Sequence, residues 1–178
     1  MILEGKTAIV TGASRGIGRA IALELASLGA HCVMAARDAA ALDSAVREIR
    51  AIANGSRKAC YLAGDLRDPD APLRLAEFAI AQTRRIDIVV NNAGATKRGN
   101  FLDLNDDDWA DGFALKFFGA VRLTRACWTH LAAVRGSLVS ISGTGGRTPG
   151  AAFSIGGSVN AAMQSFSKAM AEQGIADG

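Results

Sequence analysis

The sequence has few of the features that define special classes of protein. Its three cysteines, Cys32, Cys60 and Cys127, are widely spaced in apolar surroundings. This argues against a disulfide framework or a metal site and favours buried free thiols in a reducing compartment. No apolar run is long enough to span a bilayer, and the N-terminus does not resemble a signal peptide. The net charge is only +3, and residues 106–108 form the one block of like charge, so neither nucleic acid nor a membrane is expected as a partner. We therefore expect a cytoplasmic protein.

What the chain does contain is enough apolar sequence for one sizeable core. Its 178 residues are 49% hydrophobic and 21% charged, which is typical of one globular domain over residues 1–178. Short apolar runs alternate with stretches of helical periodicity, a pattern that indicates a parallel sheet covered on both faces. The expected strands are 6–10, 30–36, 58–63, 86–91 and 136–141. The expected helices are 19–28, 39–53 (closed by Asn54 and Gly55), 70–83, 106–134 and a last helix from residue 155.

A glycine-rich segment, Thr-Gly-Ala-Ser-Arg-Gly-Ile-Gly over residues 11–18, joins the first expected strand to the first expected helix. Glycines allow a tight turn and a close approach to a phosphate, and the N-terminus of a helix favours negative charge. The spacing Gly-x-x-x-Gly-x-Gly differs from the general dinucleotide fingerprint. A glycine-rich turn of some other α/β protein is the alternative. The apolar stripe Ile17, Ile21, Leu25 and Leu28 predicts the buried face of the helix that follows.

Residues 11–18, together with Asn91-Asn92-Ala93-Gly94, resemble the short-chain dehydrogenases/reductases, and the resemblance runs from residue 5 to about 174. It implies a Rossmann-type doubly wound parallel sheet, a nicotinamide dinucleotide cofactor and an oxidoreductase that acts on an alcohol or a carbonyl. In the family, further strands and a substrate-covering segment follow the last helix. We therefore expect a sheet without these C-terminal strands, with 136–141 at an exposed edge.

The resemblance also assigns the cofactor site. Arg37 follows the second strand, where an acidic residue would favour NAD, and with Arg15 it would hold the 2′-phosphate of NADP. NADP is therefore expected over NAD, and two solvated surface arginines are the alternative. A purely structural role for Asn91 and Asn92 is as well supported as a cofactor contact. The full set of expected cofactor residues is Gly12, Ser14, Arg15, Gly16, Ile17, Gly18, Arg37, Asp65, Leu66, Asn92, Ala93 and Gly94.

The resemblance fails at the catalytic positions. In the family, a tyrosine exchanges the proton of the carbonyl oxygen, a lysine four residues later lowers the pKa of that tyrosine, a serine positions the substrate and an asparagine holds a water. This chain has one tyrosine, Tyr61, which lies inside an expected strand. The register, anchored on residues 138–143 and 166–171, gives these positions to other residue types: Gly143 (serine), Gly156 (tyrosine), Asn160 (lysine) and Lys116 (asparagine).

Three side chains near these positions are candidates for substitute chemistry. Ser142 adjoins the serine position, and Asn160 has an amide that can hydrogen-bond a ribose. Lys116 is a cation that acts as a base or a Schiff-base nucleophile when desolvated. The structural alternatives are an ion pair or a carbonyl cap for Lys116 and a bond to backbone for Ser142. A second register, with Phe153 at the tyrosine and Gly157 at the lysine, breaks the match of the last helix and restores no function.

These observations predict an NADP-binding oxidoreductase of an alcohol/carbonyl pair that lacks the usual catalytic side chains, with an unidentified small molecule as substrate. The alternative is a catalytically inactive nucleotide-binding homologue that acts as a sensor or a partner subunit. A third hypothesis is a non-redox enzyme that uses Lys116. The resemblance further implies a homodimer or homotetramer formed through the helix over 106–134 and the last helix.

Overall fold

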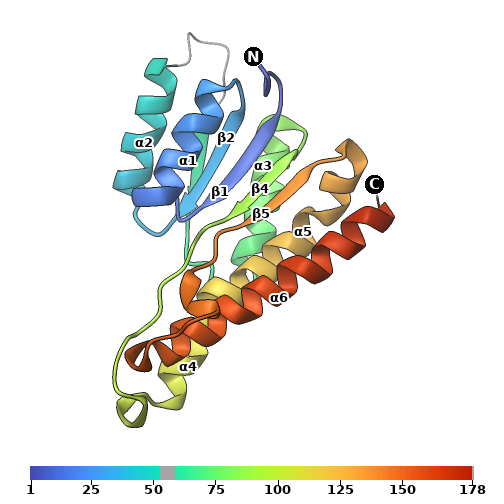
Figure 1. Cartoon of the computed structure of the whole chain (residues 1–178). Helices are drawn as coiled ribbons and strands as arrows, with labels where there is room; N and C mark the ends of the chain where they lie inside the picture. Colours follow the sequence, from blue (N-terminus) through green and yellow to red (C-terminus); the bar gives the residue numbers. More distant parts are fainter. Residues whose placement is uncertain (53–58, 178) are drawn as a thin grey trace.

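The fold is built on a parallel sheet with the strand order β3-β2-β1-β4-β5 (Figure 1). The computed structural model describes residues 1–52 and 59–177. Neighbouring strands pair in parallel throughout, as buried apolar strands joined by helices should. The strands are β1 (Thr7–Thr11), β2 (His31–Ala36), β3 (Ala59–Ala63), β4 (Ile88–Asn91) and β5 (Ser137–Ser140). The expected doubly wound α/β fold is therefore confirmed.

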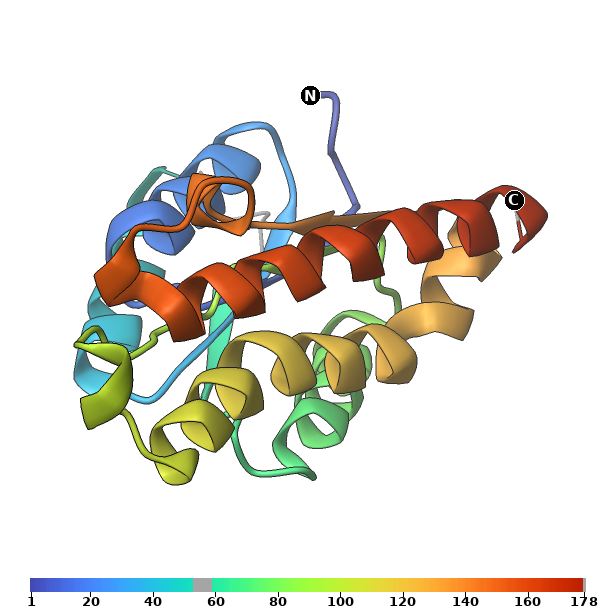
Figure 2. The same ribbon diagram turned by 60° about the horizontal axis from the view of Figure 1, so that its bottom comes forward.

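Helices cover both faces of the sheet (Figures 1 and 2). One core cluster packs α1 and α2 against the sheet, and a second packs α3 and α5 against its other face. The helices are α1 (Gly16–Ser27), α2 (Ala39–Ile52), α3 (Ala71–Thr83), α4 (Asp106–Phe113), α5 (Gly119–Val134) and α6 (Ser154–Asp177). Three short 3₁₀ turns also occur: η1 (Phe101–Asp103), η3 (Thr144–Gly146) and η4 (Ala151–Phe153). The residues expected to close the second helix, Asn54 and Gly55, lie outside the described residues.

The expected helix over 106–134 is a continuous helical run with a π-helical segment in its middle. This segment, η2 (Ala114–Phe118), separates α4 from α5. A π-helical turn inserts an extra residue into the helix and is frequent at functional sites. Sequence periodicity predicts the run but not the insertion, because the inserted turn depends on what the helix packs against.

The buried face of α1 differs from the one expected. Its buried residues are Gly18, Ala22 and Ala26. Ile17, by contrast, is 64% exposed, whereas Ile21 and Leu25 are half-buried at the rim of the core. Of the expected stripe, Ile21 and Leu25 therefore pack on the core and Ile17 does not, and small residues face the strands because α1 lies close to the sheet.

The last helix, α6, has the expected apolar stripe only in its first half. Ile155, Val159 and Met163 are buried, whereas Phe166 and Met170 are half-buried. Figure 2 shows α6 alongside the helical run of α4, η2 and α5, and the contacts of α6 with this run are mostly to α4 and η2. Among residues 1–52 and 59–177, neither α6 nor any other helix is both long and apolar enough to cross a bilayer.

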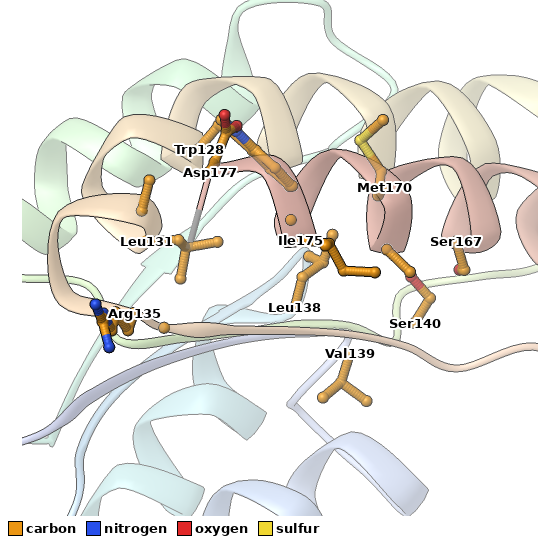
Figure 3. Close-up of a pocket in the computed structure, with 14 residues that line it drawn as sticks. Trp128, Leu131, Arg135, Leu138, Val139, Ser140, Ser167, Met170, Ile175 and Asp177 are labelled. Atoms are coloured by element: carbon orange, nitrogen blue, oxygen red, sulfur yellow. The ribbon is translucent and has the colours of Figure 1, made fainter.

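An apolar pocket of about 540 Å³ lies between α5, β5 and the second half of α6 (Figure 3). Leu131, Leu138 and Ile175 line it, and the Trp128 indole N–H closes one side by donating to the Asp177 carboxylate at 2.6 Å. Next to it, β5 is the last strand of the described sheet, as expected, and Val139 on this strand is 43% exposed.

Candidate functional site

A cleft of about 950 Å³ follows the carboxyl ends of all five strands. In open α/β sheets ligands bind at this edge, at the point where the strand order reverses. Here that point lies between β1 and β4, at the centre of the cleft. Of the expected cofactor residues, all but Gly18 line the cleft: Gly12, Ser14, Arg15, Gly16, Ile17, Arg37, Asp65, Leu66, Asn92, Ala93 and Gly94. Lining residues that the sequence reasoning did not select include Ala41, Gly64, Ala95, Leu115 and Ile141.

The turn after β1 is shaped by its glycines. Gly12 and Gly16 have φ angles of +66° and +56°, the left-handed region that favours glycine. A Cβ on Gly12 would lie 2.9 Å from the Ala93 Cα. A Cβ on Gly18 would lie 2.4 Å from the Gly12 carbonyl oxygen, so Gly18 fixes the turn from behind instead of lining the cleft. The result is a bare backbone cradle at the start of α1.

The N-terminus of α1 is also free of the groups that usually satisfy a helix start. Its N-cap residue, Arg15, makes no side-chain cap hydrogen bond, and the first turn carries no acid. By contrast, Asn105 and Asp108 form a complete capping box at the start of α4. The first N–H groups of α1 therefore face the cleft without a side-chain acceptor, and their partial positive charge suits a phosphate.

The two asparagines after β4 brace the sheet. The Asn92 amide donates to the carbonyl oxygens of Thr11, at 2.9 Å, and Gly12, at 3.3 Å. The Asn91 amide donates to the Thr124 hydroxyl on α5 at 3.1 Å. Both side chains thus have the structural role that the sequence left open, while a contact between the Asn92–Gly94 segment and a cofactor stays a prediction.

The end of the cleft beside β2 and β3 carries two arginines together with two acids, Asp38 and Asp65. Arg15 and Arg37 are exposed there, and an Arg37 guanidinium nitrogen lies 3.9 Å from the Asp65 carboxylate. Arg67, which the sequence reasoning missed, holds Asp65 through its backbone N–H at 3.0 Å and bonds Asp111 on α4 at 2.5 Å. The bond to Asp111 raises the pKa of Arg67. Asp65 is thus held by Arg67. The exposed ion pair between Arg37 and Asp65 stabilises the fold by less than about 1 kcal/mol, so Arg37 can leave Asp65 for a more highly charged anion.

The opposite end of the cleft, beside β4 and β5, carries a half-buried cation. Lys116 lies in η2 and lines the cleft, and its stem packs on Gly94, where an added Cβ would lie 2.8 Å from the Lys116 Cδ. Burial lowers the pKa of Lys116. Among the described residues of this chain the Lys116 ammonium group has no acid partner and no carbonyl cap.

The residues that the resemblance assigns to the serine and lysine positions, with the neighbouring Ser142, hold one another. Asn160 is 3% exposed and does not line the cleft; its Oδ1 accepts from the Gly143 N–H at 3.2 Å. This geometry gives Asn160 a loop-holding role in place of the ribose contact expected for it. Ser142 does line the cleft, but its hydroxyl donates to the Asn160 carbonyl oxygen at 3.1 Å.

The space above Gly156 is filled by an aromatic ring that the sequence reasoning set aside. A Cβ on Gly156 would lie 2.1 Å from the Phe153 ring, and one on Gly145 would lie 2.8 Å from it. The Arg98 guanidinium stacks on the other side, 4.0 Å from the ring centroid. The close spacing of glycines around Phe153 is the signal that would have indicated this packing.

Comparisons with known proteins agree with this geometry. A family model described as short chain dehydrogenase matches residues 6–178. An uncharacterized oxidoreductase, MT0954 of Mycobacterium tuberculosis (strain CDC 1551 / Oshkosh), is 36% identical over 168 residues, which are 93% of this chain and 63% of that protein. The chain thus spans less than two thirds of that relative's length.

Solved structures of the same kind superpose on nearly the whole chain. A metagenomic short-chain oxidoreductase in complex with NADP is 34% identical, with a TM-score of 0.92 over 99% of this chain and 80% of that one. L-Sorbose reductase from Gluconobacter frateurii, complexed with NADPH and L-sorbose, is 30% identical, with a TM-score of 0.93 over 99% of this chain and 68% of that one.

Proposed function

The chain belongs to the short-chain dehydrogenase family of oxidoreductases, and on that premise we propose that it binds NADP(H) in the cleft and interconverts an alcohol and a carbonyl compound. The observation that carries the proposal is the cleft itself, in which an uncapped helix start and a glycine cradle meet at the strand ends. When bound, the reduced cofactor supplies a hydride to the substrate carbonyl carbon.

Different residues of the cleft would bind different chemical groups of the cofactor. The N–H groups at the start of α1 suit the pyrophosphate. Arg15 and Arg37 suit the 2′-phosphate, because two guanidinium groups form charge-assisted bonds to a dianion. Asp65 keeps acceptor capacity beyond its bonds to Arg67 and suits the amino group of the adenine. NADP-bound relatives support the preference for NADP over NAD.

A turnover assay tests this proposal. The protein would be incubated with NADPH and a panel of ketoses, 3-oxoacyl thioesters and aromatic ketones, and the loss of the reduced cofactor followed by absorbance. We expect consumption of NADPH with at least one class of carbonyl and none without a carbonyl. Saturable binding of NADPH with no turnover on any class would contradict the enzymatic part of the proposal.

A second candidate function is a catalytically inactive nucleotide-binding homologue that acts as a sensor or a partner subunit. The observation in its favour is that the Phe153 ring, which has no hydroxyl, fills the space above Gly156, the residue that the resemblance assigns to the tyrosine position. Cofactor binding without turnover separates this candidate from the first. For either candidate we propose a cytoplasmic setting, supported by Cys32 and Cys127, which are buried as thiols.

A further inference from the structure

Lys116 is the titratable group that distinguishes one end of the cleft from the other. Four other ionisable side chains line the cleft in the described residues, and all of them follow β1, β2 or β3: Arg15, Arg37, Asp38 and Asp65. Lys116 alone lies at the end formed after β4 and β5, beside Gly94, Ser142 and Gly143. In the proposed function, the phosphate groups occupy the first end, so the reacting end is the one that holds Lys116.

The local structure holds this lysine in place without neutralising it. The π-helical turn of η2 carries Lys116, and its stem lies against the bare backbone of Gly94. Lys97, the other lysine near this loop, is paired with Asp108 at 2.8 Å, whereas Lys116 has no such pair in the described chain. The Lys116 nitrogen is not among the buried polar atoms without a partner in the described residues, so the packed stem presents an ammonium group that still reaches the solvent of the cleft. An ammonium group held in this way at the lining of a cleft is available to a ligand.

Among the described residues, no charged group shifts the pKa of Lys116. On its own helical run the preceding acid, Asp111, is bonded to Arg67. The facing loops after β4 and β5 present Gly94, Ser142 and Gly143, which carry no charge. Burial is the one cause that lowers the pKa of Lys116.

We propose that Lys116 is the catalytic acid and base of this site, a role that rests on the proposed function. In the reducing direction, the substrate carbonyl oxygen gains an O–H bond as the Lys116 N–H bond breaks, while the carbonyl carbon takes the hydride of the reduced nicotinamide. The neutral amine that results regains its proton from water. In the oxidising direction, the neutral amine accepts the hydroxyl proton of the alcohol, and the oxidised nicotinamide takes the hydride.

If Lys116 is the acid and base, the rates of reduction and oxidation should depend on pH in opposite directions. Because burial lowers the pKa of Lys116, the neutral amine is present closer to neutral pH than for an ordinary lysine. The rate of carbonyl reduction should fall as pH rises through the pKa of Lys116. The rate of alcohol oxidation should rise over the same interval.

Turnover by three variants tests the role. Lys116→Met keeps the length of the side chain and removes the proton, so kcat should fall on the order of 100-fold or more. Lys116→Arg keeps the charge but holds its proton at all working pH values, so it should lose activity as well and lose the pH dependence. Lys168→Met is the matched control, because Lys168 is exposed on α6 and does not line the cleft; it should keep the wild-type rate.

A measurement without turnover completes the test. In protein labelled with ¹⁵N at the lysine side chains, the resonance missing from Lys116→Met should titrate at lower pH than the bulk of the lysines, and this variant should bind NADPH within threefold of wild type. Wild-type turnover in Lys116→Met, or titration of Lys116 together with the bulk, would overturn the role and leave the proposed function standing. Failure of the wild-type protein to bind NADPH would overturn the proposed function itself. NADPH binding without turnover by the wild type on any carbonyl would overturn the role and favour the inactive homologue.

Discussion

At the scale of single residues, Asp87 is the one charged residue buried within the described chain, and several donors hold its carboxylate. Its carboxylate accepts from the Thr7 N–H at 2.8 Å and from Arg85 Nε at 2.7 Å, and Lys6 Nζ lies 3.3 Å away. Burial alone would raise the pKa of Asp87, but the bonds from Arg85, Thr7 and Lys6 outweigh burial and lower it. The ionised carboxylate therefore joins the starts of β1 and β4.

Asp87→Asn should destabilise the fold by about 2–4 kcal/mol, because it leaves Arg85 beside an uncharged amide in a buried network. Since the folded-state pKa of Asp87 is depressed, its stabilisation is present above the ordinary carboxyl pKa and is lost as pH falls through the folded value. Thermal unfolding followed by circular dichroism should show the wild type losing stability below about pH 4, and the variant losing less. Asp103→Asn, at an exposed acid, is the control. An Asp87→Asn melting temperature equal to that of the wild type would contradict the network.

Arg37 should decide which phosphorylation state of the cofactor is preferred. Arg37→Asp removes a guanidinium that suits a 2′-phosphate and supplies a carboxylate that suits a free ribose hydroxyl. The ratio of NADPH to NADH affinity should fall by roughly 10- to 100-fold, the effect of one charge-assisted bond. Arg47→Ala on α2, where Arg47 pairs with Asp43 outside the cleft, should leave the ratio unchanged. An unchanged ratio in Arg37→Asp would remove Arg37 from the site.

At the scale of helices, substitutions at Gly112 in α4 and Gly174 in α6 test how closely α4 and α6 approach their neighbours. A Cβ on Gly112 in α4 would lie 2.4 Å from a methyl group of Ile155, which is fully buried in α6. A Cβ on Gly174 in α6 would come no closer than 4.0 Å to Trp128. Alanine favours a helix over glycine by about 1 kcal/mol, but overpacking costs about 1–3 kcal/mol. Overpacking should therefore make alanine destabilising at Gly112, whereas helix propensity should make alanine stabilising at Gly174.

We expect Gly112→Ala to lower the free energy of unfolding by about 1–2 kcal/mol and Gly174→Ala to raise it by about 0.5–1 kcal/mol. Urea unfolding of the two variants and the wild type measures both changes. Stabilisation by Gly112→Ala would show that α4 and α6 are not in close contact.

The helices and strands also show what sequence patterns can and cannot predict. Alternating apolar runs and helical stretches predict the parallel sheet, and the strand boundaries agree within two residues in the described chain. The residue types at 11–18 and 91–94 predict the cleft, since strand ends must meet at one edge. Side-chain periodicity does not give the distance between elements. The small-residue face of α1 and the Phe153 ring over Gly156 were therefore not predicted.

At the scale of the whole molecule, the described helical run over α4, η2 and α5 carries one largely exposed aromatic ring. Phe118 is 45% exposed there, with the Arg122 guanidinium 5.5 Å from its ring. We propose that this run and α6 associate with a second copy of the chain, as a homodimer or homotetramer. Sedimentation velocity should show a mass at or above that of a dimer, and Phe118→Asp should shift it toward the monomer. A monomer at all concentrations would contradict this assembly.

The cleft depends on all five strands, because each contributes the residues that follow its carboxyl end. The measurement that tests its assignment most directly is a fluorescence titration of the purified protein with NADPH and, in parallel, with NADH. We predict saturable binding of both, with a Kd for NADPH at least about tenfold below that for NADH, as one charge-assisted phosphate contact implies. No saturable binding of either cofactor at millimolar concentration would contradict the assignment of the cleft, and equal affinities would contradict the role of Arg15 and Arg37.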